Sequence, residues 1–150
     1  MRGIMEKTLR EFFLKEDSVD AFWLGGSKAT NKEDQLSDLD LMLVTSTYSD
    51  LFKKFETFLD ETFGITHKWE LGEIPGKGYH QAFYVLSGFH ELFYLDVVVF
   101  HSPEAQLLGE YFNQKRHGDP YILFDKTGIL ENAKKLNRSF SPKPRAFEDE

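Results

Sequence analysis

Three carboxylates and a glycine-rich turn are the residues of this chain whose types and spacing could do chemistry. Gly25-Gly26-Ser27 is followed, after ten residues, by Asp38 and Asp40, which stand two positions apart in an apolar run. In a strand, such residues project from the same face. Two neighbouring carboxylates repel each other unless a cation lies between them, and Mg²⁺ prefers oxygen ligands. The pattern predicts a site for a metal-bound polyphosphate.

Asp96 is the third carboxylate, and it lies in a second apolar run that ends at Phe100. If the two runs form paired strands in register, Asp96 converges with Asp38 and Asp40. Binding alone does not need a third carboxylate. A transfer reaction can use it to share a second metal ion or to accept a proton from an attacking hydroxyl. The alternative is that Asp96 faces water from an edge strand.

The glycine-rich turn is the expected phosphate contact. The backbone N–H groups of Gly25 and Gly26 are expected to form an anion site, because glycine lets a phosphate approach without a Cβ clash. Ser27 adds a hydroxyl donor and can cap a following helix, whose N-terminus favours anions.

The elements that position these residues follow from hydrophobic periodicity. Strands are expected at 19–24, 38–44, 65–71, 81–86, 92–100 and 121–124, and helices at 5–13, 51–59, 103–116 and 129–136. Gly64 is expected to end the second helix. This order predicts an α/β (α+β) fold, with a mixed β-sheet and helices packed mainly on one face. Residues 1–138 are expected to form one domain, and 139–150 a disordered tail.

Composition restricts the class of protein. The chain has 150 residues, the size of one domain, and no cysteine for disulfides or thiol chemistry. Its net charge of -7 argues against a duplex nucleic-acid binder. It has no apolar run of the ~20 residues that span a bilayer, and Met1 to Lys7 lack the apolar core of a signal peptide. We therefore expect a soluble, cytoplasmic protein.

These motifs resemble those of the polymerase-β-like nucleotidyltransferase superfamily. The resemblance is carried by Leu24-Gly25-Gly26-Ser27, by the run from Ser37 to Val44, and by Leu95-Asp96-Val97, and it covers about residues 1–130. It is greatest to the small prokaryotic branch of aminoglycoside and lincosamide adenylyltransferases and antitoxin-type protein adenylyltransferases. The resemblance implies two Mg²⁺ ions, ATP as substrate, and catalytic and metal-binding roles for Asp38, Asp40 and Asp96.

The chain also departs from these relatives. Many of them carry an arginine three residues after the motif serine, where this chain has Thr30. Lys28 or Lys32 is the candidate to make a phosphate contact in place of that arginine. Relatives often have an Asp-Lys pair after their last strand, so Lys126 is a further nucleotide-binding candidate, although a plain turn is the favoured interpretation.

The resemblance allows three explanations for the short length of this sequence. Antibiotic-modifying relatives continue into a helical domain that builds much of the acceptor pocket, whereas this sequence ends at Glu150. It is a minimal catalytic domain, a piece of a longer protein, or a subunit that relies on a partner protein.

The predicted function is Mg²⁺-dependent transfer of a nucleoside monophosphate, AMP from ATP, to a hydroxyl of a small antibiotic-like molecule or a protein. The alternative is an antitoxin-like, non-catalytic module that keeps the fold and binds a partner. A magnesium phosphohydrolase is disfavoured, because the sequence has no nucleophile-elbow or Walker pattern. His80 and Trp69 are candidates for the acceptor side, with ordinary strand residues as the favoured interpretation of both.

Overall fold

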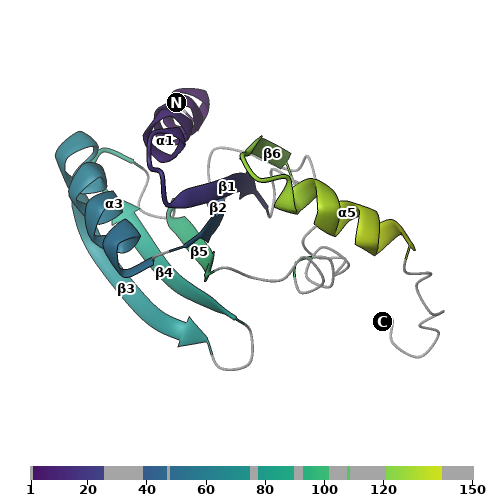
Figure 1. Cartoon of the computed structure of the whole chain (residues 1–150). Helices are drawn as coiled ribbons and strands as arrows, with labels where there is room; N and C mark the ends of the chain where they lie inside the picture. Colours follow the sequence, from purple (N-terminus) through teal and green to yellow (C-terminus); the bar gives the residue numbers. More distant parts are fainter. Residues whose placement is uncertain are drawn as a thin grey trace, which may run out of the picture.

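A computed structural model describes residues 2–25, 39–46, 48–74, 78–89, 93–101, 108 and 121–139. These residues form a mixed α+β fold in which helices pack on a β-sheet (Figure 1). The elements are α1 (Arg2–Leu14), β1 (Val19–Leu24), β2 (Leu39–Thr45), α3 (Tyr48–Thr62), β3 (Ile65–Ile74), β4 (Tyr79–Leu86), β5 (Leu95–His101), β6 (Tyr121–Asp125) and α5 (Ile129–Ser139). No helix in this part of the chain is both long enough and apolar enough to cross a membrane.

The described strands form one sheet in the order β3-β4-β5-β2-β1-β6. β2 and β5 run parallel, and the other neighbouring pairs run antiparallel. A parallel pair needs a crossover connection, and here α3, β3 and β4 lie between β2 and β5 in the sequence. The mixed sheet expected from the sequence is therefore confirmed, and its central parallel pair is made by the two strands that carry Asp40 and Asp96.

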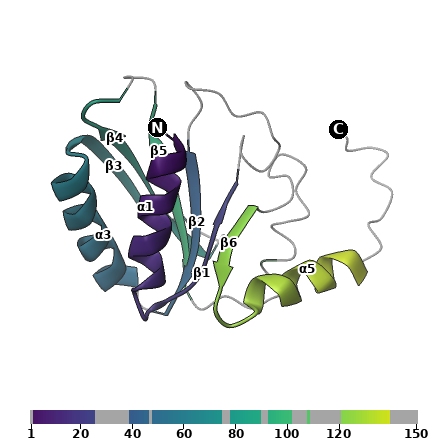
Figure 2. The same cartoon turned by 90° about the horizontal axis from the view of Figure 1, so that it is seen from above.

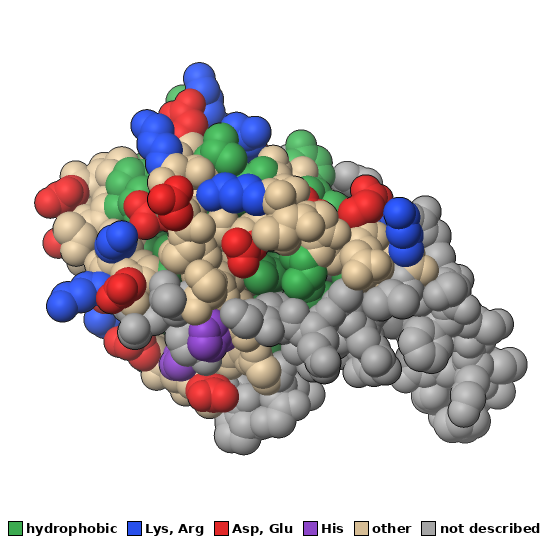
Figure 3. Space-filling view, viewed as in Figure 1, with side chains coloured by type: hydrophobic (Ala, Val, Ile, Leu, Met, Phe, Trp, Pro, Cys, Tyr) green, Lys and Arg blue, Asp and Glu red, His purple; other side chains and the backbone are tan. Residues whose placement is uncertain are grey.

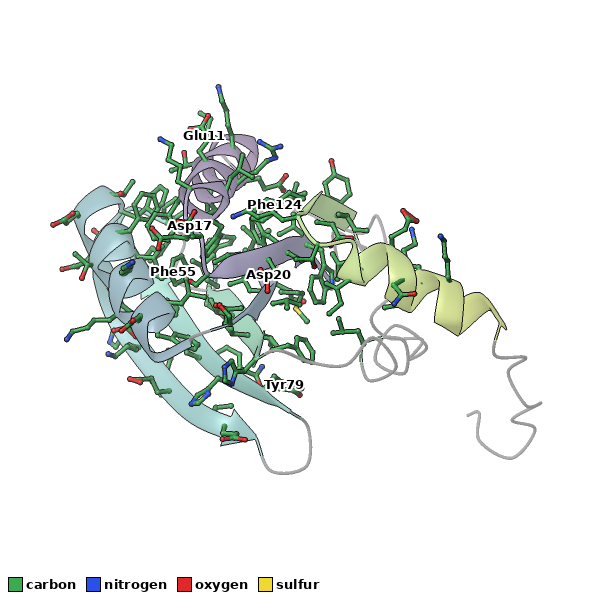
Figure 4. All side chains as sticks on the ribbon, viewed as in Figure 1. Glu11, Asp17, Asp20, Phe55, Tyr79 and Phe124 are labelled. Carbon is green, nitrogen blue, oxygen red and sulfur yellow. The ribbon has the colours of Figure 1, made fainter. Side chains whose placement is uncertain are left out.

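One face of the sheet is covered by α1 and α3, which run roughly along the strands (Figure 2). Leu39, Leu41 and Leu43 alternate along β2 and belong to the core under these helices. Phe13 of α1 and Phe55 of α3 are fully buried there, with ring centroids 5.0 Å apart. In Figure 4, Phe55 lies between α3 and the sheet. The residues that alternate with the three leucines must project from the other face.

The other face has a second core, to which α5 contributes. Leu130 and Ala133 pack with Trp23, Met42 and Phe100, and these strand residues project away from α1 and α3. The expectation that helices pack mainly on one face holds for α1 and α3. It does not hold for α5, because the apolar positions of α5 are buried against the opposite side of the sheet.

The expected strands and helices that fall on described residues are present, but most of their boundaries differ from the expected ones by about one to three residues. The strand expected at 19–24 is β1, and Gly64 ends α3 with φ +80° and an N–H that donates to the carbonyls of Leu59 and Asp60, each at 3.0 Å. The strand expected at 65–71 continues to Ile74, because it pairs with β4 along most of its length. The helix expected at 103–116, apart from buried Leu108, and residues 140–150 lie outside the described residues.

A buried tyrosine links α3 to the sheet. Tyr84 is fully buried, and its hydroxyl donates to Glu56 Oε2 at 2.7 Å. Lys68 Nζ lies 3.0 Å from Oε1 of the same glutamate. Burial, together with the hydrogen bond to Glu56, raises the pKa of Tyr84 far above its usual value. The hydrogen bond to Glu56 also raises the pKa of Lys68.

On the outer surface, acidic and basic side chains are interspersed (Figure 3).

This link predicts a loss of stability in alkaline solution. Above about pH 10 the unfolded chain releases the Tyr84 proton while the folded chain keeps it. The free energy of unfolding should then fall by about 1.4 kcal/mol per pH unit from this group. Lys68 acts in the same direction, because its pKa is also raised by folding. Urea unfolding of wild type and Tyr84→Phe between about pH 7 and about pH 11 measures this, and the variant should show the shallower decline. Equal pH dependence of the two proteins would contradict the prediction.

Candidate functional site

Asp40 and Asp96 lie side by side in the middle of the sheet. In the parallel pairing of β2 with β5, Asp40 is the direct partner of Asp96. Neighbouring strands are about 4.8 Å apart, and directly paired side chains project from the same face. Both carboxylates therefore project from the face opposite α1 and α3, and both are partly buried. The convergence expected for these two residues is confirmed.

The paired positions continue across the sheet. Asp96 is also the partner of Phe83 in β4, and Phe83 is the partner of Trp69 in β3. Trp69, Phe83, Asp96 and Asp40 thus form one row across four neighbouring strands, which we call the carboxylate row. Its direction is perpendicular to the strands, so each member is about one strand spacing from the next. The row joins an anionic centre to an aromatic end.

Gly25 lies at the other end of the carboxylate row. Its N–H donates to the backbone carbonyl of Asp40 at 3.1 Å, so it extends the pairing of β1 with β2. Gly25 is not one of the described glycines with positive φ, and an added Cβ would meet Met42 Cγ at an ordinary 3.6 Å. This N–H is therefore part of the sheet and is not the phosphate donor expected at this position.

Five of the candidate site residues lie outside the described residues: Gly26, Ser27, Lys28, Lys32 and Asp38. Their roles stay predictions from the sequence. The described residues on either side of this segment lie close to the carboxylate row. Gly25 bonds to Asp40, and the N–H of Leu39 donates to the carbonyl of Tyr94 at 3.1 Å. Gly25 and Leu39, the described residues that flank positions 26–38, therefore both lie beside the row.

Lys126 is not part of this arrangement. Its Nζ donates to the carbonyl of Glu16 at 2.9 Å, and its N–H donates to the carbonyl of Asp20 at 2.8 Å. Asp20 is near the start of β1, whereas Gly25 directly follows the other end of β1 and bonds to Asp40 of β2. Asp125 accepts hydrogen bonds from the first N–H groups of α5. The segment from Asp125 is thus a turn into a helix, the structural interpretation favoured from the sequence, and Lys126 binds the backbone.

The two acceptor-side candidates project from different faces. His80 contacts the Phe52 ring of α3 at 5.8 Å between centroids, so it lies on the face away from the carboxylates. Trp69 belongs to the carboxylate row, and 54% of its surface is exposed. Only Trp69 is placed where it could contact a molecule that reaches Asp96.

Gln81 is a site residue that the sequence interpretation missed. Its Nε2 donates to Asp96 Oδ1 at 2.8 Å in a partly buried position. An ionised carboxylate can only accept, so the NH₂ group of Gln81 must be the side that faces Asp96. The hydrogen bond fixes the orientation of the Asp96 carboxylate. The sequence could have indicated Gln81 as a candidate. It is a polar residue in an otherwise largely apolar strand, β4, and it projects from the same face as Tyr79 and Phe83.

The carboxylate pair supplies oxygen atoms of the kind that Mg²⁺ prefers as ligands. Asp40 and Asp96 are hard oxygen donors at directly paired positions, and a cation between them would relieve their repulsion. Within the described part of the chain no group of three or more His, Asp or Glu side chains could hold a metal ion. The third expected ligand, Asp38, lies outside that part. The described residues therefore supply two of the three expected ligands.

Replacing Gln81 with leucine should weaken metal binding. Groups that orient a metal ligand typically contribute 10- to 100-fold to metal affinity, so Gln81→Leu is expected to weaken Mg²⁺ binding by about tenfold. Isothermal titration of the intact protein with Mg²⁺ measures this. Gln81→Met keeps the length and the packing of the side chain but has no N–H to donate, so equal weakening in this variant would assign the effect to the hydrogen bond. Wild-type affinity in Gln81→Leu would exclude the orienting role.

A comparison of the sequence with protein-family models and with curated proteins finds no match to either. A functional assignment for this chain therefore rests on its own residues. The described residues place the pair Asp40 and Asp96 between Gly25 on one side and the rings of Phe83 and Trp69 on the other.

Proposed function

We propose that this chain is a Mg²⁺-dependent nucleotidyltransferase that moves a nucleoside monophosphate, AMP from ATP, to a hydroxyl group of an acceptor. The acceptor is a small antibiotic-like molecule or a protein. The observation that carries the proposal is the direct pairing of Asp40 with Asp96 on adjacent parallel strands. Carboxylates separated by more than fifty residues in the sequence are brought to one point of the sheet.

The carboxylates have separate roles in this reaction. Asp40, together with Asp38 as predicted from the sequence, would hold Mg²⁺, which neutralises charge on the phosphates of the donor and the leaving pyrophosphate. Asp96, which Gln81 orients, would be a further ligand for the metal and would accept the proton of the acceptor hydroxyl. The hydroxyl oxygen bonds to the α-phosphorus while the bond from that phosphorus to the oxygen bridging to the β-phosphorus breaks. The products are the nucleotidylated acceptor, pyrophosphate and one proton.

The donor belongs on the Gly25 side of the carboxylates. Gly25 hydrogen-bonds to the backbone of Asp40, and the predicted phosphate contacts Gly26, Ser27 and Lys28 follow it in the sequence. A triphosphate held by this segment would start directly beside the metal ligands. Lys126 has no role in the proposal, because it lies at the far end of β1.

Binding of Mg-ATP tests the proposal. The wild-type chain is expected to bind Mg-ATP with a dissociation constant between about 1 μM and about 1 mM, the usual range for enzyme substrates. Asp40→Asn should weaken this binding at least about tenfold, because it removes one anionic metal ligand. Asp17→Asn makes the same chemical change at an exposed position outside the row and should bind as wild type does.

Two results would contradict the proposal. One is the absence of Mg-ATP binding in the wild type, and the other is equal binding by wild type and Asp40→Asn. Either result would favour the alternative module that binds a partner protein without catalysis. Co-purification of such a partner with both wild type and Asp40→Asn would then be the expected observation.

A further inference from the structure

The carboxylate row is chemically different on its two sides. Gly25, with no side chain, lies beside Asp40, whereas Phe83 and Trp69 lie beside Asp96. A triphosphate is bound by N–H groups and cations, which on the Gly25 side are the predicted contacts Gly26, Ser27 and Lys28 and not the N–H of Gly25 itself. An aromatic surface supplies neither. The aromatic end is therefore suited to a molecule of another kind than the phosphates.

The aromatic end is built from supported rings. Phe83 contacts the Tyr94 ring edge-on, at 5.7 Å and 67°, and Trp69 stacks on His67 at 5.9 Å and 11°. Such contacts hold aromatic rings in defined orientations. Trp69 still exposes 54% of its surface. A tryptophan whose orientation is supported by one neighbouring ring, and whose surface is more than half exposed, can stack with a planar ring of a ligand.

Spacing connects this surface to the reaction. Phe83 is one strand spacing, about 5 Å, from Asp96, and Trp69 is about 10 Å from it. When the acceptor hydroxyl gives its proton to Asp96, the rest of the acceptor molecule must lie against the face of the sheet from which Asp96 projects. The Gly25 side is assigned to the phosphates, so the remaining direction along the row leads over Phe83 and then Trp69.

We infer that the acceptor carries a planar, apolar ring within about 10 Å of its reacting hydroxyl, and that Phe83 and Trp69 bind this ring. The inference rests on the proposed function, since it names the acceptor class for that site. Binding by ring stacking selects flat substituents over puckered ones, because only a flat ring can lie against the aromatic faces. The adenine of the donor has the same chemistry and is the competing occupant, which the experiment separates.

Two alcohols that differ in ring planarity test the inference on the full chain. 2-Phenylethanol and 2-cyclohexylethanol have the same chain and hydroxyl, and only the first is planar. Ligand-observed NMR titrations without nucleotide give their dissociation constants. We expect 2-phenylethanol to bind about fivefold more tightly, and Trp69→Ala to weaken its binding by about tenfold. Trp69→Phe should retain most of the affinity. Ile4→Ala, an exposed apolar truncation on α1, should leave it unchanged.

Four outcomes would count against the inference or against the proposed function on which it rests. Equal binding of the two alcohols, or no effect of Trp69→Ala, excludes a ring site at this end. Displacement of 2-phenylethanol by adenosine, with equally weakened Mg-ATP binding in Trp69→Ala, assigns the site to the donor base and overturns the acceptor inference. Ring binding that depends on Trp69 in a protein that fails to bind Mg-ATP keeps the ring site and rejects nucleotidyl transfer. The two proposals therefore fail separately.

Discussion

Asp96→Asn is expected to reduce the rate of nucleotidyl transfer by about 10³-fold. Asparagine keeps the size of the side chain but cannot accept the acceptor's proton, and general base catalysis contributes about 10²- to 10⁴-fold. The substitution also removes the negative charge beside Asp40, so residue 96 would bind a metal ion less strongly. Single-turnover transfer of label from α-labelled ATP measures the effect. 2-Phenylethanol can serve as the acceptor if it binds as inferred above.

The control for this substitution is the same chemical change elsewhere. Asp17→Asn, at an exposed position of the turn after α1, should transfer at the wild-type rate. Asp96→Asn should bind Mg-ATP within about tenfold of wild type, because Asp40 remains. Its thermal midpoint should show that the sheet is intact. If Asp96→Asn kept more than about a tenth of the wild-type transfer rate, Asp96 would not be the general base of the reaction.

Phe13→Ala is expected to lower the free energy of unfolding by about 4 kcal/mol. Fully buried Phe→Ala substitutions cost about 3–5 kcal/mol, because apolar area is lost and a cavity remains. Phe13 is fully buried, and its ring lies 4.9 Å from Phe22 of β1 and 5.0 Å from Phe55 of α3. It therefore joins both helices to the sheet on the face away from the carboxylates. Domains are stable by only about 5–15 kcal/mol, so this is a large fraction.

Urea unfolding monitored by far-UV circular dichroism measures the stability effect. Leu14→Ala is the matched control, because Leu14 is the next residue of α1 and is exposed, and it should cost less than about 0.5 kcal/mol. Equal losses in the two variants would show that α1 does not depend on the buried contacts of Phe13. The carboxylate row lies on the opposite face, so folded Phe13→Ala should still bind Mg-ATP.

The local elements could be predicted from the sequence. β1 has the predicted bounds, and Leu39, Leu41 and Leu43 lie in the core as their alternation required. Gly64 ends α3 with the positive φ that glycine favours. These features depend on residues close together in the chain, whose side-chain direction is set by the period of the strand or helix. The face from which Asp40 projects follows from the same alternation.

The composition of the site was decided by contacts between distant segments. Asp40 meets Asp96 because of the register of a parallel pair, and a shift of one residue would have sent one carboxylate to the opposite face. Gln81 bonds to Asp96 because β4 pairs beside β5, and Lys126 binds the backbone before β1 because β6 pairs at the other edge.

The sequence by itself therefore determined the strands, their buried faces and the candidate carboxylates. The tertiary structure decided which carboxylates are neighbours, which side chain orients Asp96, and that Trp69 shares their face while His80 does not. The physical reason is that the alternation of apolar and polar residues along a strand depends only on which of its two faces is buried. It does not specify which other strands lie beside it. Strand order and register arise only when the sheet assembles.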